Sequence, residues 1–207
     1  MTDETMHFYE PSKGHGLKHD PFNSIIAPRP IGWISTRGKD GTLNLAPYSF
    51  FNGFNYIPPI IGFSSTSLKD TARNAIETGE FVWNLGTTAL AEKLNQTSRP
   101  LAHGDSEFAD AGLTPLPSRL VQAPRVAESP VHFECKVTDV VKLRDIDGQE
   151  TPAIVIFGQV IAGHISNALL DGGVFNTFGA GIIMRAGGPT AYATIGPDTR
   201  FDMRRPD

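Results

Sequence analysis

The feature that most constrains the fold is a strict alternation of apolar and polar residues in the second half of the chain. Successive side chains of a β-strand point to opposite faces, so this period of two is typical of a half-buried strand. An Asp-Ile-Asp-Gly turn follows at 145–148, and residues 151–165 are predicted to return as the antiparallel partner. The alternation sets Val131, Phe133, Cys135 and Val137 against His132, Glu134, Lys136 and Thr138.

Further strands are predicted before this hairpin. Residues 31–37 and 42–51 indicate two strands joined by a Lys-Asp-Gly turn, residues 58–64 a third strand and residues 81–85 a fourth. Pro47 has no amide hydrogen to donate, so the strand that contains it must be bulged or lie at a sheet edge there. A bulge would expose backbone amides between residues 44 and 49.

Short helices are predicted between the strands. Ser67 and Asp70 have the spacing of a capping box, and Gly79 lies where a left-handed residue ends a helix, which predicts a helix over 68–78. Residues 88–95 indicate another short helix, and residues 99–130 are expected to form a long connection with at most a short helix near 106–111. About six strands with short helices inserted between them favour a closed antiparallel β-barrel over a parallel α/β sheet.

Charge and composition exclude several classes of protein. The 207 residues carry 18 Lys and Arg against 22 Asp and Glu, for a net charge of −4, without the basic cluster that nucleic-acid binding requires. The polar N-terminus has no secretory signal pattern, and no apolar stretch reaches membrane-spanning length, so no membrane partner and a cytoplasmic location are expected. The single cysteine excludes an internal disulfide, and glycines beside His15 and His19 argue against a metal-binding helix.

The first candidate for chemistry is the hydroxyl-rich stretch from residue 64 to residue 71. Its serines and threonines lead into the predicted helix N-terminus, whose unpaired amides and positive dipole end attract anions. Lys69 adds a full positive charge in the first turn, which is unfavourable unless an anion such as phosphate binds there. The alternative is an ordinary serine-rich cap with a solvated lysine.

The second candidate is the segment from Asn44 to Ser49, with Ser35 and Thr36 on the neighbouring strand. A strand interrupted by proline presents backbone donors and acceptors at fixed positions, which can bind the polar edge of a flat heterocycle. Alternatively, it is an edge strand in which Pro47 blocks aggregation. The two candidates together are what a phosphorylated ring cofactor needs.

Other residue types have simpler interpretations. Cys135 shares a strand face with apolar residues and is predicted to be a buried, inert thiol. Trp33 and Trp83 are predicted to anchor the core. His164 lies near the end of a strand, where it is either a hydrogen-bonded structural residue or a proton donor.

Five motifs, taken in order, resemble the flavin reductase-like, FMN-binding split-barrel family that includes flavoredoxin. They lie at residues 28–36, 44–51, 69–71, 81–85 and 185–192, and the resemblance runs from about residue 20 to about residue 195. The chain is therefore expected to comprise an N-terminal extension (1–20), an FMN-binding split-barrel domain (21–195) and a C-terminal tail (196–207).

The resemblance implies a split β-barrel with Greek-key topology and a homodimer with two FMN sites near the subunit interface. It implies that the backbone from Asn44 through Ser49 lines the edge of the isoalloxazine ring, and that Arg185 belongs to a closing element near the flavin. Matching positions for the phosphate and ribityl chain are Ser35, Thr36, Ser64, Ser65, Lys69, Asp70 and Thr71, while those along the ring edge are Asn44, Leu45, Ala46, Pro47, Tyr48 and Ser49.

The function expected from these residues is that of an NAD(P)H-dependent flavin reductase, in which hydride passes from the nicotinamide to N5 of FMN. Such chemistry belongs to the flavin and needs no side-chain nucleophile. His164 is expected to help seat the nicotinamide, and an oxygenase or an electron-transfer protein is the expected partner. The alternatives are a flavoredoxin-like electron carrier with tightly bound FMN and a flavin-binding protein without turnover.

Overall fold

The structure is a computed structural model that describes residues 5–102 and 104–206. Residues 1–4 of the expected extension and residue 207 of the expected tail lie outside the described residues. The described chain is mainly β, as predicted, and its main sheet has the strand order β3-β2-β6-β9-β10-β5-β4 with every neighbouring pair antiparallel. The strands of this sheet are β2 (Gly32–Arg37), β3 (Leu43–Tyr48), β4 (Phe51–Asn55), β5 (Ile60–Ser65), β6 (Glu80–Asn84), β9 (Val131–Arg144) and β10 (Glu150–Ile165).

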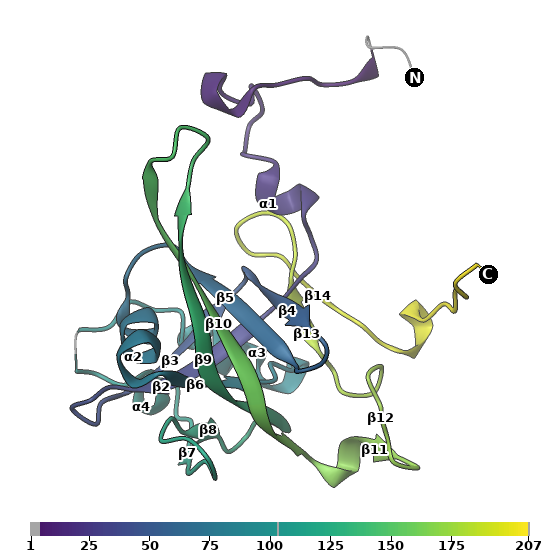
Figure 1. Cartoon of the computed structure of the whole chain (residues 1–207). Coiled ribbons are helices and arrows are strands. Elements are labelled where there is room, and N and C mark those ends of the chain that lie inside the picture. The colour runs from purple at the N-terminus through teal and green to yellow at the C-terminus, as the bar shows by residue number, and fades with distance from the viewer. Residues whose placement is uncertain (1–4, 103, 207) are drawn as a thin grey trace.

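The main sheet curls, but it is split rather than continuous. Its two edge strands, β3 and β4, are consecutive in the chain and are joined by Ser49 and Phe50, and the amide of Ser64 in β5 donates to the carbonyl of Phe50 at 2.8 Å. Strands β5 and β6 follow each other in the chain but lie apart in the main sheet, because the long hairpin β9–β10 is inserted between them, as in a Greek key. Figure 1 shows this hairpin crossing the whole molecule.

Three small sheets were not predicted, because strands of two or three residues carry no detectable period. One of them pairs the segment just before β2 with a hairpin from the end of the domain, so it brings the N- and C-terminal parts together. The small sheets are β1 (Arg29–Pro30) with β13 (Ile183–Arg185) and β14 (Tyr192–Thr194), β7 (Pro115–Leu116) with β8 (Arg125–Val126), and β11 (Leu170–Asp171) with β12 (Val174–Phe175).

The helices are short, and none of those described is long and apolar enough to cross a membrane. The predicted helices over 88–95 and 106–111 correspond to a 3₁₀ turn (Thr88–Leu90) followed by α3, and to α4. The α-helices are α1 (Phe22–Ile25), α2 (Asp70–Thr78), α3 (Ala91–Gln96) and α4 (Glu107–Asp110), and the other 3₁₀ turns are Pro11–Lys13, Asn167–Leu169 and Pro197–Thr199.

Helix α2 ends as predicted but begins later. Gly79 is its left-handed C-terminal residue, with φ of 73°. The predicted start at residue 68 and the capping box are wrong, because the N-cap is Lys69, in extended conformation and without a side-chain capping bond. The carbonyl of Ser67 instead accepts bonds from the Lys69 amide and the Ser65 hydroxyl, so the chain turns once more before the helix starts.

The inner face of the curled sheet packs against α2. Phe63 and Phe81 meet edge to face at 5.3 Å between ring centroids, and Cys135 is fully buried beside them, as predicted. Burial raises the pKa of the Cys135 thiol, which keeps it protonated. The buried members of this inner core are Ile34, Ile61, Phe63, Ala72, Ala75, Phe81, Cys135, Ile154 and Ile156.

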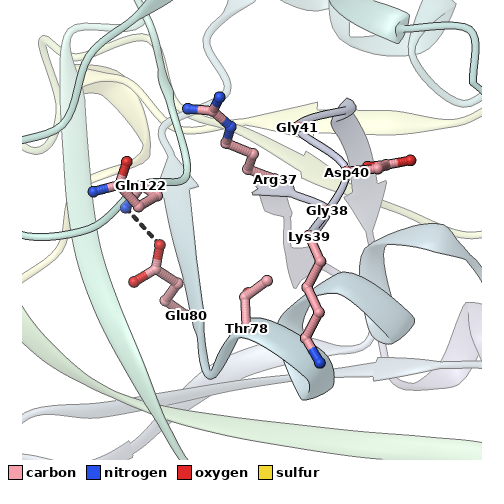
Figure 2. A pocket seen from close by; sticks show the side chains of 8 residues that line it. All are labelled: Arg37, Gly38, Lys39, Asp40, Gly41, Thr78, Glu80 and Gln122. Carbon is pink, nitrogen blue, oxygen red and sulfur yellow. Dashed lines mark hydrogen bonds between the residues drawn. The ribbon is translucent and has the colours of Figure 1, made fainter.

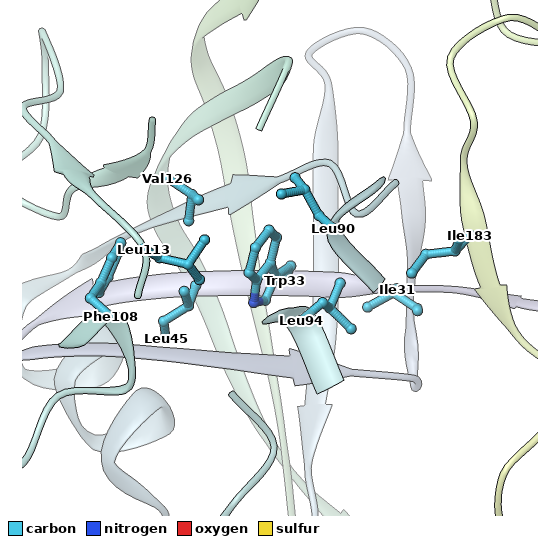
Figure 3. Close-up of a cluster of buried hydrophobic side chains, with 9 residues drawn as sticks. All are labelled: Ile31, Trp33, Leu45, Leu90, Leu94, Phe108, Leu113, Val126 and Ile183. Carbon is cyan, nitrogen blue, oxygen red and sulfur yellow. The ribbon is translucent and has the colours of Figure 1, made fainter. Parts of the chain in front are cut away.

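The outer face of strands β2 and β3 is also buried, beneath the chain that runs from α3 to β8 (Figure 3). Trp33 lies at the centre, fully buried, and its indole nitrogen donates to the Thr97 hydroxyl at 3.0 Å. This confirms Trp33 as a core anchor, whereas Trp83 is only partly buried and packs at the edge of the inner core. The outer core comprises Ile31, Trp33, Leu45, Leu90, Leu94, Phe108, Leu113, Val126 and Ile183.

The inner core leaves no room for a side chain at Gly158. A Cβ atom there would clash with the Phe81 ring and lie 3.2 Å from Cβ of Cys135. We expect Gly158→Ala to lower the free energy of unfolding by about 1 to 3 kcal/mol, because the core must shift to accept it. Gly53→Ala is the control, since nothing lies within 4 Å of a Cβ there. Equal midpoints for both variants in urea unfolding would contradict this packing.

Candidate functional site

The segment from Asn44 to Ser49 forms the edge strand β3 and the bend into β4. Pro47 lies on the edge, as one of the two predicted alternatives required, and the register from Arg37↔Leu43 to Gly32↔Tyr48 is continuous, without a bulge. The amide of Leu45 is already bound to the Glu107 carboxylate of α4 at 3.0 Å. One backbone amide of this edge is therefore already hydrogen-bonded within the protein, and the bend at Ser49 follows the edge strand.

Alternate residues of β3 point into the barrel and meet the start of α2. The Asn44 amide donates to the Thr71 hydroxyl at 2.6 Å, and the Tyr48 hydroxyl lies beside Thr71 and Ser65. Burial raises the pKa of Tyr48, so the phenol stays neutral. Four of the predicted residues, Asn44, Tyr48, Ser65 and Thr71, are thus brought together as a polar cluster that fixes α2 against the strands.

Lys69 is exposed at the N-terminus of α2, next to this cluster. No side chain caps the helix, although Asp70 in its first turn forms an ion pair with Arg73. The exposed Lys69 ammonium group and the positive end of the helix dipole together attract anions, although Thr71 and Ala72 of the first turn are buried.

Ser35 and Thr36 lie on β2 and are fully buried. The Ser35 hydroxyl donates to the carbonyl of Pro124 at 2.5 Å and accepts from the Asn84 amide at 3.0 Å, and the Thr36 hydroxyl accepts from Asn74 at 3.2 Å. Both side chains have partners within the protein, so their assignment to a ligand stays a prediction.

Two surface grooves meet at Ser49. The Pro47 groove, about 350 Å³ in volume, runs between β3, the end of α3 and the β13–β14 hairpin. It brings together Pro47, Ser49 and Arg185 of the predicted residues. Its lining consists of Ile31, Pro47, Ser49, Asn95, Ser98, Arg185, Pro189, Thr190 and Tyr192.

The Phe50 groove lies on the other side of Ser49, is about 340 Å³ in volume and is mainly apolar and aromatic. It contains Ser64 of the predicted residues, together with Arg29 at the start of β1. Its lining consists of Ile26, Pro28, Arg29, Pro30, Ser49, Phe50, Phe51, Asn52, Phe54, Gly62, Ser64 and Val155. Each groove has the volume of a small-ligand site.

A larger pocket of about 490 Å³ lies at the β2–β3 turn and contains none of the predicted residues (Figure 2). Its buried carboxylate, Glu80, already accepts the Gln122 amide and forms an ion pair with Lys136 at 2.7 Å. The pocket has no aromatic wall, so the two grooves at Ser49 are the better candidates for a ring ligand.

His164 lies away from these grooves. In the sheet, His164 of β10 is the register partner of His132 in β9. The register continues across the sheet to Asn84 in β6, Trp33 in β2 and Pro47 in β3. Four strand spacings therefore separate His164 from Pro47, about 19 Å along the sheet. Its ring bonds the fully buried Glu134 carboxylate at 2.6 Å. These contacts favour the structural interpretation of His164.

Glu134 and His132 were expected on the polar face of a half-buried strand, but both are buried. Glu134 accepts the amides of Arg119 and Leu120 at 2.8 and 2.6 Å, and the His132 ring bonds the carbonyl of Val126 at 2.8 Å. Burial alone would raise the pKa of Glu134, but these hydrogen bonds lower it. The sequence pattern does not show these roles, because the covering segment has no period of its own.

Comparison with known proteins identifies the family. Residues 25–179 match the family described as "Flavin reductase like domain". The chain belongs to this flavin reductase-like family. A relative from Aquifex aeolicus, described as an uncharacterized protein, is 41% identical over 152 residues, covering 71% of this chain and 74% of the relative.

Two solved structures show the same fold. Nitrilotriacetate monooxygenase component B from Bacillus cereus is 30% identical, with a TM-score of 0.86 and coverage of 96% of this chain and 98% of that one. A putative flavin reductase with a split barrel domain from Shewanella frigidimarina is 24% identical, with a TM-score of 0.81 and coverage of 96% and 100%. The split-barrel prediction is confirmed, and family membership supports a flavin-related role.

The buried histidine of this flavin reductase-like chain gives a prediction about pH. Burial lowers the pKa of His132 to about 4, so the folded protein binds the proton less readily than the unfolded chain, whose histidine titrates near 6.5. The stabilisation is present above pH 6.5 and is lost as pH falls toward 4, with a slope of at most about 1.4 kcal/mol per pH unit.

The His132→Gln variant should remove this contribution, which urea unfolding between pH 7 and pH 4 measures. His19→Gln is the control, because His19 is exposed. A pH profile of His132→Gln parallel to that of the unsubstituted protein would contradict the prediction.

Proposed function

We propose that this protein binds FMN and acts as an NAD(P)H-dependent flavin reductase, with the flavin site at the junction of the two grooves at Ser49. The observation that carries the proposal is that Pro47, Ser49, Ser64 and Arg185 line the two grooves that meet at Ser49, and that the start of α2 follows Ser64 closely in the chain. The membership of the family supports a flavin ligand. When bound, FMN would supply the hydride-accepting ring.

The residues present fit the parts of such a ligand. A flat ring system needs apolar walls and a few polar groups at its edge. The Phe50 groove offers aromatic walls, and the hydroxyls of Ser49 and Ser64 lie in its lining. The neighbouring Pro47 groove adds the Asn95 amide and the Ser98 hydroxyl.

The phosphate end of FMN is assigned to the N-terminus of α2. Lys69 is exposed there, and no side chain of the described residues caps the helix, so the ammonium group is accessible to an anion at the helix end. The neighbouring polar cluster of Asn44, Ser65 and Thr71 fixes the helix end in place. A rigid anion site binds more tightly because less conformational freedom is lost on binding.

The assembly and partners belong to the same proposal. Large apolar side chains are exposed near the Phe50 groove, among them Phe54, Tyr56 and Ile57, which are 58%, 87% and 81% exposed. Such a patch supports a homodimer that covers the site. The similarity to a monooxygenase component supports an oxygenase as the electron acceptor. A buried, protonated Cys135 is compatible with a cytoplasmic location.

The function is tested by purifying the protein, desalting it and recording the flavin absorbance. Oxidation of NADH and of NADPH is then followed with and without added FMN. Rapid oxidation that requires FMN supports the reductase. Retained flavin without any oxidation of either nucleotide would overturn it in favour of an electron carrier, and absence of flavin binding would overturn both.

The phosphate assignment predicts a selective effect of Lys69→Ala. Loss of one charge-assisted bond should weaken FMN about 10- to 100-fold and riboflavin little, because riboflavin has no phosphate. Titration of both flavins by fluorescence measures the ratio. Lys39→Ala, which removes another exposed lysine, is the control. Equal losses for the two flavins would argue against this placement.

A further inference from the structure

Two arginines beside the two grooves have no carboxylate partner among the residues that the structure describes. Arg29 in β1 and Arg185 in β13 are directly opposite each other in the antiparallel register. Like charges in this position destabilise a sheet. Burial, together with the charge of Arg185, lowers the pKa of Arg29, which shows that the environment disfavours its charge.

Among the described residues, neither guanidinium forms an ion pair with a carboxylate. Arg185 donates to the carbonyls of Gly188, Pro189 and Ala191, and Arg29 donates to that of Asn23. Carbonyl groups satisfy hydrogen bonds but do not cancel a net charge. The two positive charges are therefore left uncompensated within the described part of the chain.

Arg29 also has an unused donor. The residue is only 8% exposed, and its Nε atom is buried with no hydrogen-bond partner among the described residues. Leaving such a buried donor unpaired is unfavourable. The remainder of the side chain is held in place by the Phe50 ring, which lies 5.7 Å from the guanidinium carbon. The donor is thus preorganised at the groove.

The two arginines lie where a ligand could reach both. Arg29 lines the Phe50 groove, Arg185 lines the Pro47 groove, and Ser49 belongs to both linings. An anion between them would neutralise two charges and accept the unused donor. A phosphate group fits this requirement, because it carries up to two negative charges and several acceptor oxygens and pairs well with guanidinium groups.

We propose that Arg29 and Arg185 form a phosphate-binding site for a nucleotide bound at the junction of the two grooves. The site is separate from the Lys69 site, and it rests on the proposed function only for the identity of the nucleotide. One FMN has one phosphate, so two phosphate sites suit two ligands, FMN and a pyridine nucleotide. If Lys69 does not bind the flavin phosphate, the arginine pair takes that role.

The experiment begins with the flavin-free protein and inorganic pyrophosphate as the probe, measured by calorimetry at two salt concentrations. We expect binding that weakens with salt, that falls tenfold or more in Arg29→Gln, and that falls less in Arg29→Lys, which keeps the charge but loses Nε. Arg37→Gln is the control, because Arg37 is an exposed arginine of the pocket at the β2–β3 turn.

Circular dichroism checks that each variant folds. Should Arg29→Gln fail to fold, the comparison of Arg29→Lys with Arg37→Gln decides the question. Pyrophosphate binding that is absent from the unsubstituted protein, or equal in Arg29→Lys and Arg37→Gln, would overturn the proposal.

The source of the phosphate is then read from two measurements, the KM for the pyridine nucleotide and the ratio of FMN to riboflavin affinity. A pyridine nucleotide source predicts that Arg29→Lys raises the KM for NADH or NADPH and leaves the ratio of FMN to riboflavin affinity unchanged. A flavin source predicts that this ratio falls and that Lys69→Ala leaves it unchanged. If pyrophosphate binds as described but no flavin binds, the arginine site stands and the proposed reductase function fails. If Arg29→Lys changes neither the KM for the pyridine nucleotide nor the ratio of FMN to riboflavin affinity, the nucleotide assignment fails.

Discussion

The rest of the structure depends on how the long connection between β6 and β9 satisfies its buried backbone. Three side chains of the sheet do this: Glu80 accepts the amide of Gln122, Asn84 accepts that of Val126, and Glu134 accepts those of Arg119 and Leu120. Buried polar groups without partners are costly, so these bonds decide where the connection lies.

Once the connection lies on the sheet, it completes the outer core. Leu94, Phe108 and Val126 all come from it, and they enclose Trp33. The same connection carries α3, and Asn95 in α3 and Ser98 just after it line the Pro47 groove. The shape of that groove therefore depends on polar side chains of other strands as well as on the local sequence near Pro47.

The strands were predictable because period-2 patterns report which face of a strand is buried. The pattern at residues 131–138 located β9 correctly but suggested one exposed face, since it cannot reveal that a remote, aperiodic segment covers the polar side chains. The start of α2 shows a second limit. Ser67 and Asp70 have capping-box spacing, but Ser67 is held in a preceding turn by its carbonyl, so the helix begins after Lys69.

The candidate site was predictable where it is local in the sequence. Asn44, Ser65 and Thr71 meet as neighbouring motifs, and Pro47 lies on an edge because it lacks an amide hydrogen. Arg29 was missed, because its importance arises only from the distant Arg185 that the fold places opposite it. No local pattern in the sequence shows that two arginines will be paired.

This pairing ties ligand binding to stability. Strand β1 pairs with β13 at two positions, and one of these pairs joins two positive charges. An anion that binds only the folded state stabilises it in proportion to the logarithm of its concentration above the dissociation constant. For this pair the gain is local, since neutralising the charges removes the repulsion between β1 and β13. The pairing of β1 with β13, which brings the N- and C-terminal parts of the domain together, is thus most stable when an anion is bound beside it.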